Sequence, residues 1–397
     1  MQNEYYIERT QSPFVLWILA FQFCFQYICA MLGFSGASII LSFALIGISL
    51  YELIRGRMKI PVAYLIILFC VMVVFILSMF FLVDDTATRD YFMRFMLYEA
   101  IALLLGYQVE DKEGIISRVV VIGVVLLPFL LRSNVMDRET PRQMGFAYAC
   151  LPVLLASFFG LTYGKKIAIL STINIVAIIL GFSSYAPRGV WLVIGTVLCL
   201  CFYWHFCKSN SKKSSRIGGI ALLTFFIIAV SFLLNNFEWL VVSVNDFLIN
   251  KLNIKIYALQ KFVLYLGKEN VLNGRENLWI QAREVISRNP FTGNGIGYYE
   301  SINNGAYCHN ILLEAFCEAG LFFVIPIILY IGTVLVRLLN SPYAEEKVGF
   351  QWLALTFCVG IEPLFLSSSY WMYTPFWFFL GAFLRESKQK KLNRRNI

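Results

Sequence analysis

Apolar stretches long enough to cross a lipid bilayer follow one another along most of this chain. A membrane helix needs about 20 apolar residues to span the hydrocarbon layer. Of the 397 residues, 59% are hydrophobic and 14% are charged, whereas a soluble domain carries roughly 25% charged residues. So much apolar surface cannot be buried in one water-soluble core. We therefore expect an all-α, polytopic integral membrane protein.

The hydropathy pattern predicts about twelve membrane spans in a single membrane domain, residues 1–397. One long loop, residues 236–309, separates the ninth predicted span from the tenth. The predicted spans are residues 13–31, 35–51, 60–83, 92–107, 115–131, 145–162, 165–182, 190–206, 217–235, 310–336, 348–366 and 372–384.

The basic residues predict the orientation of these spans. Twenty of the 33 lysines and arginines fall in the termini and in the loops of one side, whereas the short loops of the other side hold six. Lysine and arginine concentrate in short cytoplasmic loops. Both termini are therefore predicted to be cytoplasmic, and the loop 236–309 is predicted to lie on the outer face. The same bias accounts for the net charge of +9 without a nucleic-acid partner.

Two helices and a turn are predicted inside the long loop. Residues 247–266 form an amphipathic pattern, which fits a helix on the outer leaflet or one packed on the spans. A second helix is predicted after Asn273, where Glu276 completes a capping box. It should end before Pro290, with Arg275 and Trp279 on one face. The glycine-rich residues 293–297 are predicted to form a flexible turn.

Arginine, without lysine, occupies the short outer loops. Its planar guanidinium grips phosphate through two hydrogen bonds, so these residues predict contact with a phosphorylated or diphosphate lipid head group. The alternative is ordinary ion pairing with nearby aspartates, an explanation that is weakest for Arg188, which has no acidic neighbour in sequence. The candidates are Arg89, Arg132, Arg138, Arg142 and Arg188, together with Arg275 of the long loop.

His309 and Asn310 stand at the outer mouth of the tenth predicted span. An imidazole titrates near neutral pH, so His309 is a candidate general base, with a structural polar cap as the alternative. The N–H groups that open this span would face an anion bound in the same region. Glu318 lies within the span, where an ionisable residue marks either function or helix pairing. The sequence predicts no carboxylate cluster for a metal.

Residues 274–320 carry a longer pattern: Gly274-Arg275, Trp279, Ala282, Ile286, Pro290, Gly293, Gly295, Gly297, His309-Asn310, Leu313, Glu318 and Gly320. This pattern resembles the O-antigen ligase and Wzy polymerase superfamily of bacterial membrane glycosyltransferases. A weaker likeness is Ala186-Pro187-Arg188-Gly189, where the family has Ser-Arg-Gly and Pro187 departs from it.

The resemblance implies glycan transfer from undecaprenyl diphosphate at the outer, periplasmic face of the bacterial cytoplasmic membrane, without a metal or cofactor. The leading interpretation is a polymerase, whose acceptor is another lipid-linked repeat unit. The alternatives are an O-antigen ligase, whose acceptor is lipid A core, and a transporter of lipid-linked oligosaccharides. A chain-length regulator is a candidate partner.

The resemblance also implies roles for individual residues. His309 would accept the proton of the acceptor hydroxyl, and Arg275 and Arg188 would stabilise the diphosphate that leaves with inversion at the anomeric carbon. The candidate substrate contacts are Arg89, Arg132, Arg138, Arg142, Trp279, Asn310 and Glu318.

Overall fold

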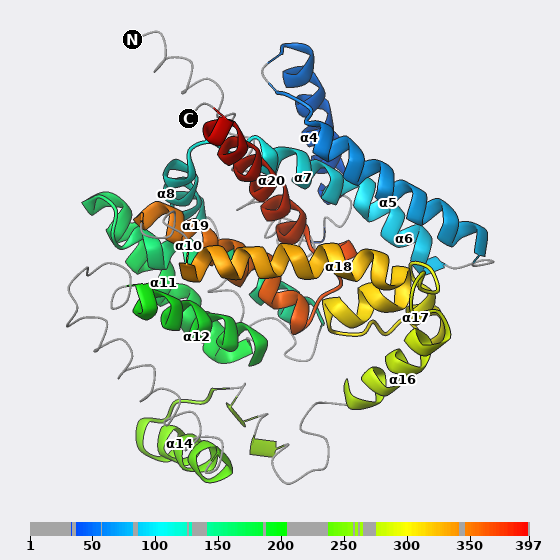
Figure 1. The fold of residues 1–397 in the computed structure, drawn as a ribbon. Coiled ribbons are helices and arrows are strands. Elements are labelled where there is room, and N and C mark those ends of the chain that lie inside the picture. Colours follow the sequence, from blue (N-terminus) through cyan, green and yellow to red (C-terminus); the bar gives the residue numbers. More distant parts are fainter. Residues whose placement is uncertain are drawn as a thin grey trace, which may run out of the picture.

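The computed structural model describes residue 33 and residues 37–56, 58–81, 86–124, 127–128, 141–185, 188–204, 237–256, 259–260, 263–264, 275–340 and 346–395. Every regular element in these residues is helical, which confirms the predicted all-α class (Figure 1). The first ten elements are α4 (Ala37–Ile54), α5 (Val62–Phe81), α6 (Thr86–Arg94), the π-helix η2 (Phe95–Glu99), α7 (Ala100–Tyr107), α8 (Lys112–Gly123), α10 (Pro141–Gly160), α11 (Lys165–Tyr185), α12 (Arg188–Tyr203) and α14 (Phe237–Leu252). The remaining elements are α16 (Arg275–Arg288), α17 (Tyr298–Ile302), α18 (Ile311–Asn340), α19 (Lys347–Leu355), the π-helix η7 (Thr356–Ile361), the 3₁₀ helices η8 (Glu362–Phe365) and η9 (Tyr370–Met372), and α20 (Thr374–Arg395).

Four helical stretches in the described residues are long and apolar enough to cross a membrane. They are Val62–Phe80, Lys165–Phe182, Ile311–Leu339 and Lys347–Phe365, with shorter apolar helices at Phe146–Gly160 and Gly189–Tyr203. The predicted spans 13–31 and 217–235 lie outside the described residues. The count of about twelve spans and the orientation therefore remain predictions.

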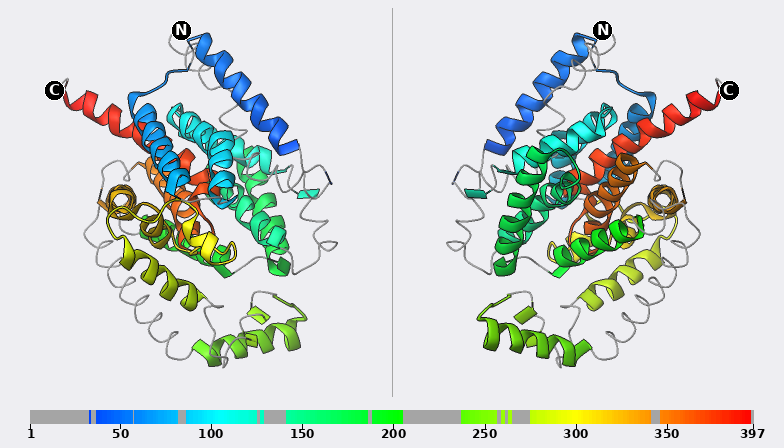
Figure 2. Two further views of the ribbon diagram at one scale, coloured as in Figure 1. Left: turned by 90° about the vertical axis from the view of Figure 1, so that its right-hand side faces the viewer. Right: turned by 90° about the vertical axis from the view of Figure 1, so that its left-hand side faces the viewer.

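The long helix α18 runs through the middle of the molecule, and α20 crosses beside it (Figures 1 and 2). Helix α20 also packs closely on α7. A Cβ atom at Gly106 would overlap the carbonyl oxygen of Phe378, and one at Gly381 would overlap that of Leu103. Small residues therefore let the two backbones approach, as is common where helices pack in membranes.

Charged side chains from three helices meet at the C-terminal end of α18. Arg337 Nη1 lies 3.6 Å from Oε2 of Glu386 in α20, and Lys112 of α8 pairs with the same carboxylate. Arg337 also donates to Ser387 Oγ at 3.1 Å. Because all three segments belong to the side predicted to be cytoplasmic, this ion-pair cluster marks the opposite end of α18 from His309.

The amphipathic helix of the long loop has different bounds from those predicted. The expected helix at residues 247–266 is wrong, because α14 covers Phe237–Leu252 and residues 253–256 are not helical. Asn253 adopts a left-handed backbone conformation, with φ at 53°, and a single such residue often ends a helix. Helix α14 lies apart from the other helices (Figures 1 and 2).

Candidate functional site

Helix α16 presents Arg275 at its first turn and packs along α18. It covers Arg275–Arg288 and ends before Pro290, as the Asn-Pro pair predicts, whereas the predicted cap at Asn273 lies outside the described residues. Ala282 and Val285 are buried on its inner face, and Trp279 donates its indole N–H to the carbonyl of Cys308 at 3.1 Å. Trp279 thus ties α16 to the residue that directly precedes His309.

The glycine-rich segment 293–297 forms the predicted turn, and backbone hydrogen bonds hold it against a break in α18. Gly295 N–H donates to the Glu318 carbonyl at 2.8 Å, and Asn294 N–H donates to the Cys317 carbonyl at 2.8 Å. At the break, Gly320 has φ 60° and ψ −154°, a conformation that is essentially restricted to glycine. A Cβ atom at Gly293 would overlap the Glu318 backbone. The turn and the broken helix can therefore pack this closely only because glycines occupy the contact.

His309 directly precedes the cap of α18. Asn310, proposed from sequence as a substrate contact, accepts hydrogen bonds through Oδ1 from Leu312 N–H at 3.0 Å and Leu313 N–H at 3.3 Å, which is an N-cap. His309 itself has φ 53°, and its ring centroid lies 4.1 Å from that of Tyr307. The Tyr307 hydroxyl donates to the carbonyl of Ser367 at 2.6 Å.

Arg275 and His309, far apart in sequence, act on each other electrostatically. Burial of the imidazole, and then the positive charge of Arg275, lower the pKa of His309 from 6.5 to about 4. The imidazole is therefore neutral at pH 7, with a free lone pair on one nitrogen. Within the described residues, no acidic side chain pairs with Arg275.

The start of α12 reaches the same neighbourhood. A Cβ atom at Gly189 would overlap the hydroxyl of Tyr148 and approach Leu366. Tyr148 also lies in the electrostatic field of Arg275 and Tyr307. The backbone of Arg188, which opens α12, therefore lies next to a tyrosine on which Arg275 and Tyr307 act electrostatically, and the Arg188 side chain lies outside the described atoms.

The other predicted arginines are only partly described. Arg89 is exposed on α6, and the same helix contacts the glycine-rich segment through Thr88 Oγ1, which donates to the Ile296 carbonyl at 2.6 Å. Arg132 and Arg138 lie outside the described residues, as does the side chain of Arg142. The structure therefore places Arg89 on a helix that abuts the site, and leaves the other three as predictions.

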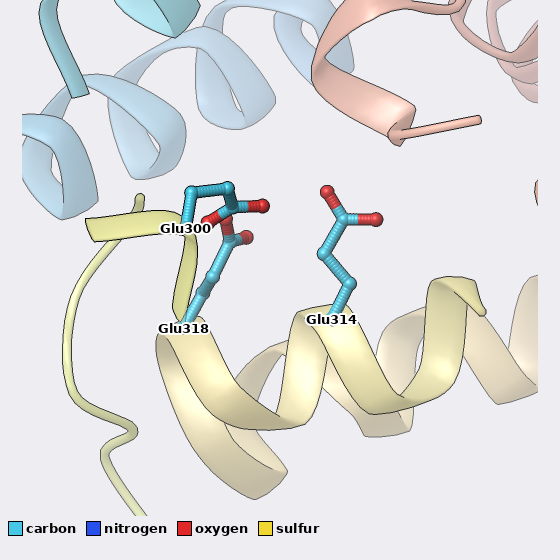
Figure 3. A group of neighbouring side chains, drawn as sticks. All are labelled: Glu300, Glu314 and Glu318. Atoms are coloured by element: carbon cyan, nitrogen blue, oxygen red, sulfur yellow. The ribbon is translucent and has the colours of Figure 1, made fainter. Parts of the chain in front are cut away.

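Three buried carboxylates come together beside the site, which the sequence interpretation missed (Figure 3). Glu314 and Glu318 project from the same side of α18, and Glu300 projects from α17 into the same space. Each offers an oxygen, and these oxygens lie within 4.8 Å of one another. The expectation that no carboxylate cluster assembles is therefore wrong. The four-residue spacing of Glu314 and Glu318 was a usable signal, whereas nothing local pointed to Glu300.

The hydrogen bonds of the cluster are unevenly distributed. Glu318 accepts from the Tyr370 hydroxyl, from Trp371 Nε1 at 2.8 Å and from Gly297 N–H at 3.4 Å. Glu314 accepts from Ser369 on one oxygen, and its other oxygen has no hydrogen-bond partner in the part of the chain that the structure describes. Three anions cannot lie so close together in a buried site. The three donors around Glu318 favour a negative charge on this carboxylate, so Glu300 and Glu314 should hold a proton or share a cation.

The family comparison covers the part of this arrangement that lies between α11 and α18. The family model described as O-Antigen ligase matches residues 169–328, from within α11 to α18. Over these residues the chain is similar to the O-antigen ligase family. The matched segment contains Arg188, Arg275 and His309 and the glycines that join α18 to residues 293–297. No curated protein matches the chain in sequence.

The family and the apolar helices together indicate an integral membrane protein of the bacterial inner membrane. They also support an activity of the O-antigen ligase or polymerase type, which acts on lipid-linked oligosaccharides. The predicted transporter is not supported by this match.

Proposed function

We propose that this protein is a polysaccharide polymerase, which transfers a glycan from undecaprenyl diphosphate to another lipid-linked repeat unit at the periplasmic face of the inner membrane. The observation that carries the proposal is a neutral His309, placed before the N-terminus of α18, on which the positive charge of Arg275 acts. The transfer requires a cation and an uncharged base. The cation would stabilise the departing diphosphate, and the base would accept the proton of the acceptor hydroxyl.

Arg275 has the chemistry to hold the leaving group. When the anomeric C–O bond breaks, the diphosphate gains negative charge, and a guanidinium fixed in place stabilises that charge. Since no described acidic side chain pairs with Arg275, its charge is available for this role. Arg188 is proposed to share this role, because the next residue, Gly189, packs against Tyr148, on which the charge of Arg275 acts. These cations would replace a metal ion, so we expect transfer to persist in EDTA.

His309 is proposed to accept the proton from the acceptor hydroxyl, which attacks the anomeric carbon from the side opposite the diphosphate. Inversion follows from this geometry. A group with a pKa of about 4 is unprotonated at pH 7 but is a weak base. Binding of an anionic diphosphate next to Arg275 would offset one of the two causes of the low pKa. Substrate binding itself would thus strengthen the base.

The ligase activity named by the family model is the second candidate, with lipid A core as acceptor. Purified protein incubated with undecaprenyl-diphosphate-linked repeat units separates the two. We expect a ladder of longer glycans from these units alone. Transfer that occurs only after lipid A core is added would instead identify a ligase, and no transfer in either mixture would contradict both.

The periplasmic placement of the site can be tested by labelling single cysteines in intact cells. A cysteine at Ser287, exposed on α16, should react with a membrane-impermeant maleimide, whereas one at Glu346, exposed before α19, should not. The reverse pattern would place Arg275 on the cytoplasmic side and rule out the proposed transfer there.

A further inference from the structure

We propose that Tyr307 is a positioning residue that holds the His309 imidazole in the orientation needed for transfer. This inference rests on the proposed function, in which His309 is the base. The two rings lie 4.1 Å apart between centroids, with an angle of 41° between their planes. At this distance the rings are in contact, and the Tyr307 ring covers part of one face of the imidazole.

Tyr307 has an orienting role to fill because, among the described residues, His309 Nδ1 lacks the hydrogen bond that usually fixes a catalytic imidazole. An imidazole that acts as a base is normally oriented through its other nitrogen, which bonds to a carboxylate or a backbone carbonyl. His309 Nδ1 is buried and has no hydrogen-bond partner among the described residues. The backbone of His309 is fixed by the Asn310 cap and by the bond from Trp279 to Cys308. The ring, by contrast, is held by its contact with Tyr307.

Tyr307 is itself anchored to a loop that contacts two other parts of the site. Its hydroxyl donates to the Ser367 carbonyl at 2.6 Å. In the same loop, Leu366 approaches Gly189 at the start of α12, and Ser369 donates to Glu314. A shift of this loop would therefore move the His309 ring relative to Arg188 and the acceptor. A misplacement of a catalytic group by about 1 Å can cost about 10²-fold in rate.

The contact also affects the charge of His309. The positive charge of Arg275 in α16 acts on the imidazole, and Tyr148 of α10 lies in the field of both Arg275 and Tyr307. Cys308 precedes the ring in the chain and is buried. Because burial is the first cause of the low pKa of His309, removing the aromatic ring should admit water and raise this pKa toward 6.5.

The titration of His309 can be followed without any transfer assay, since the chain has only two histidines. In a His205→Asn background, NMR of ¹⁵N-histidine protein in nanodiscs reports His309 alone. With Tyr307 intact, or with Tyr307→Phe, the imidazole should stay neutral down to about pH 5. With Tyr307→Leu its titration should move toward pH 6.5. An unchanged titration in Tyr307→Leu would overturn the proposed contact.

Transfer of lipid-linked repeat units then tests the orienting role. We expect Tyr307→Leu to lower kcat by about 10²-fold with little change in KM. Tyr307→Phe, which keeps the ring but loses the Ser367 tether, should show a smaller loss. Tyr298→Leu, a change at a half-buried tyrosine of α17, is the matched control and should retain kcat. Wild-type kcat in both Tyr307 variants would overturn the proposal.

These outcomes are distinguishable from failure of the proposed function. If His309→Asn transfers glycan at the wild-type rate, His309 is not the base, whatever the Tyr307 variants do. If His309→Asn is inactive while Tyr307→Leu is fully active, the base assignment stands and the positioning role of Tyr307 is wrong.

Discussion

Arg337 at the C-terminal end of α18 and Arg275, which acts on His309 at the N-terminal end of this helix, have different surroundings. At the C-terminal end, Arg337 lies 3.6 Å from Glu386, a carboxylate that also pairs with Lys112. At the N-terminal end, the charge of Arg275 in α16 acts on a neutral His309, and no described acidic side chain pairs with Arg275. An arginine matched by an acid ties helices together, whereas one without an acid has its charge available for an anionic substrate.

The sharpest way to break this comparison is to change both arginines to lysine. Arg275→Lys keeps the charge but loses the planar fork, so transfer should fall nearly as far as in Arg275→Ala, by about 10²-fold or more. Arg337→Lys can still pair with Glu386 and should retain most activity. Turnover at equal protein amounts measures both. Wild-type turnover in Arg275→Lys would show that bidentate phosphate binding is not its role.

The break in α18 offers a second matched pair, in glycine. Gly320→Ala forces a side chain into a glycine-only conformation and against the backbone of Phe291, so the protein should lose about 2 kcal/mol or more of stability. Gly332→Ala, later in the same helix, meets no atom within 4 Å and should be neutral or slightly stabilising. Thermal unfolding in detergent measures both. Equal melting temperatures would contradict the account of the turn.

In the carboxylate cluster, the same Glu→Gln change should affect stability differently at Glu318 and at Glu314. Glu318→Gln places an amide N–H₂ among three donors and should cost about 1–3 kcal/mol of stability, because a buried donor loses its acceptor. Glu314→Gln can keep its bond from Ser369 and removes a like charge, so it should have little effect. Unfolding temperatures of the two variants test this order. A greater loss in Glu314→Gln would mean that Glu314 carries the charge.

The sequence predicted helix ends correctly where neighbouring residues determine them. The Asn-Pro pair ends α16 where expected, because proline cannot continue the hydrogen-bonded ladder, and the His-Asn pair opens α18 through the Asn310 cap. The end of α14 at Leu252 was missed, since the apolar periodicity continues past Asn253 and gives no sign of its left-handed backbone.

Tertiary contacts determine what the sequence could not show. The glycines of residues 293–297 predict a turn from the sequence alone. Only the structure shows that this turn packs against the broken backbone of α18. Glu300 joins Glu314 and Glu318 only because α17 folds back on α18, and residues 369–371 supply donors from a distant part of the chain. The role of Tyr307 depends in the same way on its bond to Ser367.

The central claim is that the neutral His309 beside Arg275 takes the acceptor's proton, and single-turnover transfer by His309→Asn tests it most directly. Asparagine preserves polarity and hydrogen bonding but cannot act as a base near pH 7. We expect the variant to insert, to bind the labelled lipid-linked donor as the wild type does, and to transfer about 10²–10⁴-fold more slowly. Single-turnover transfer at the wild-type rate, with donor binding unchanged, would contradict the account and leave the arginines and the end of α18 as the whole site.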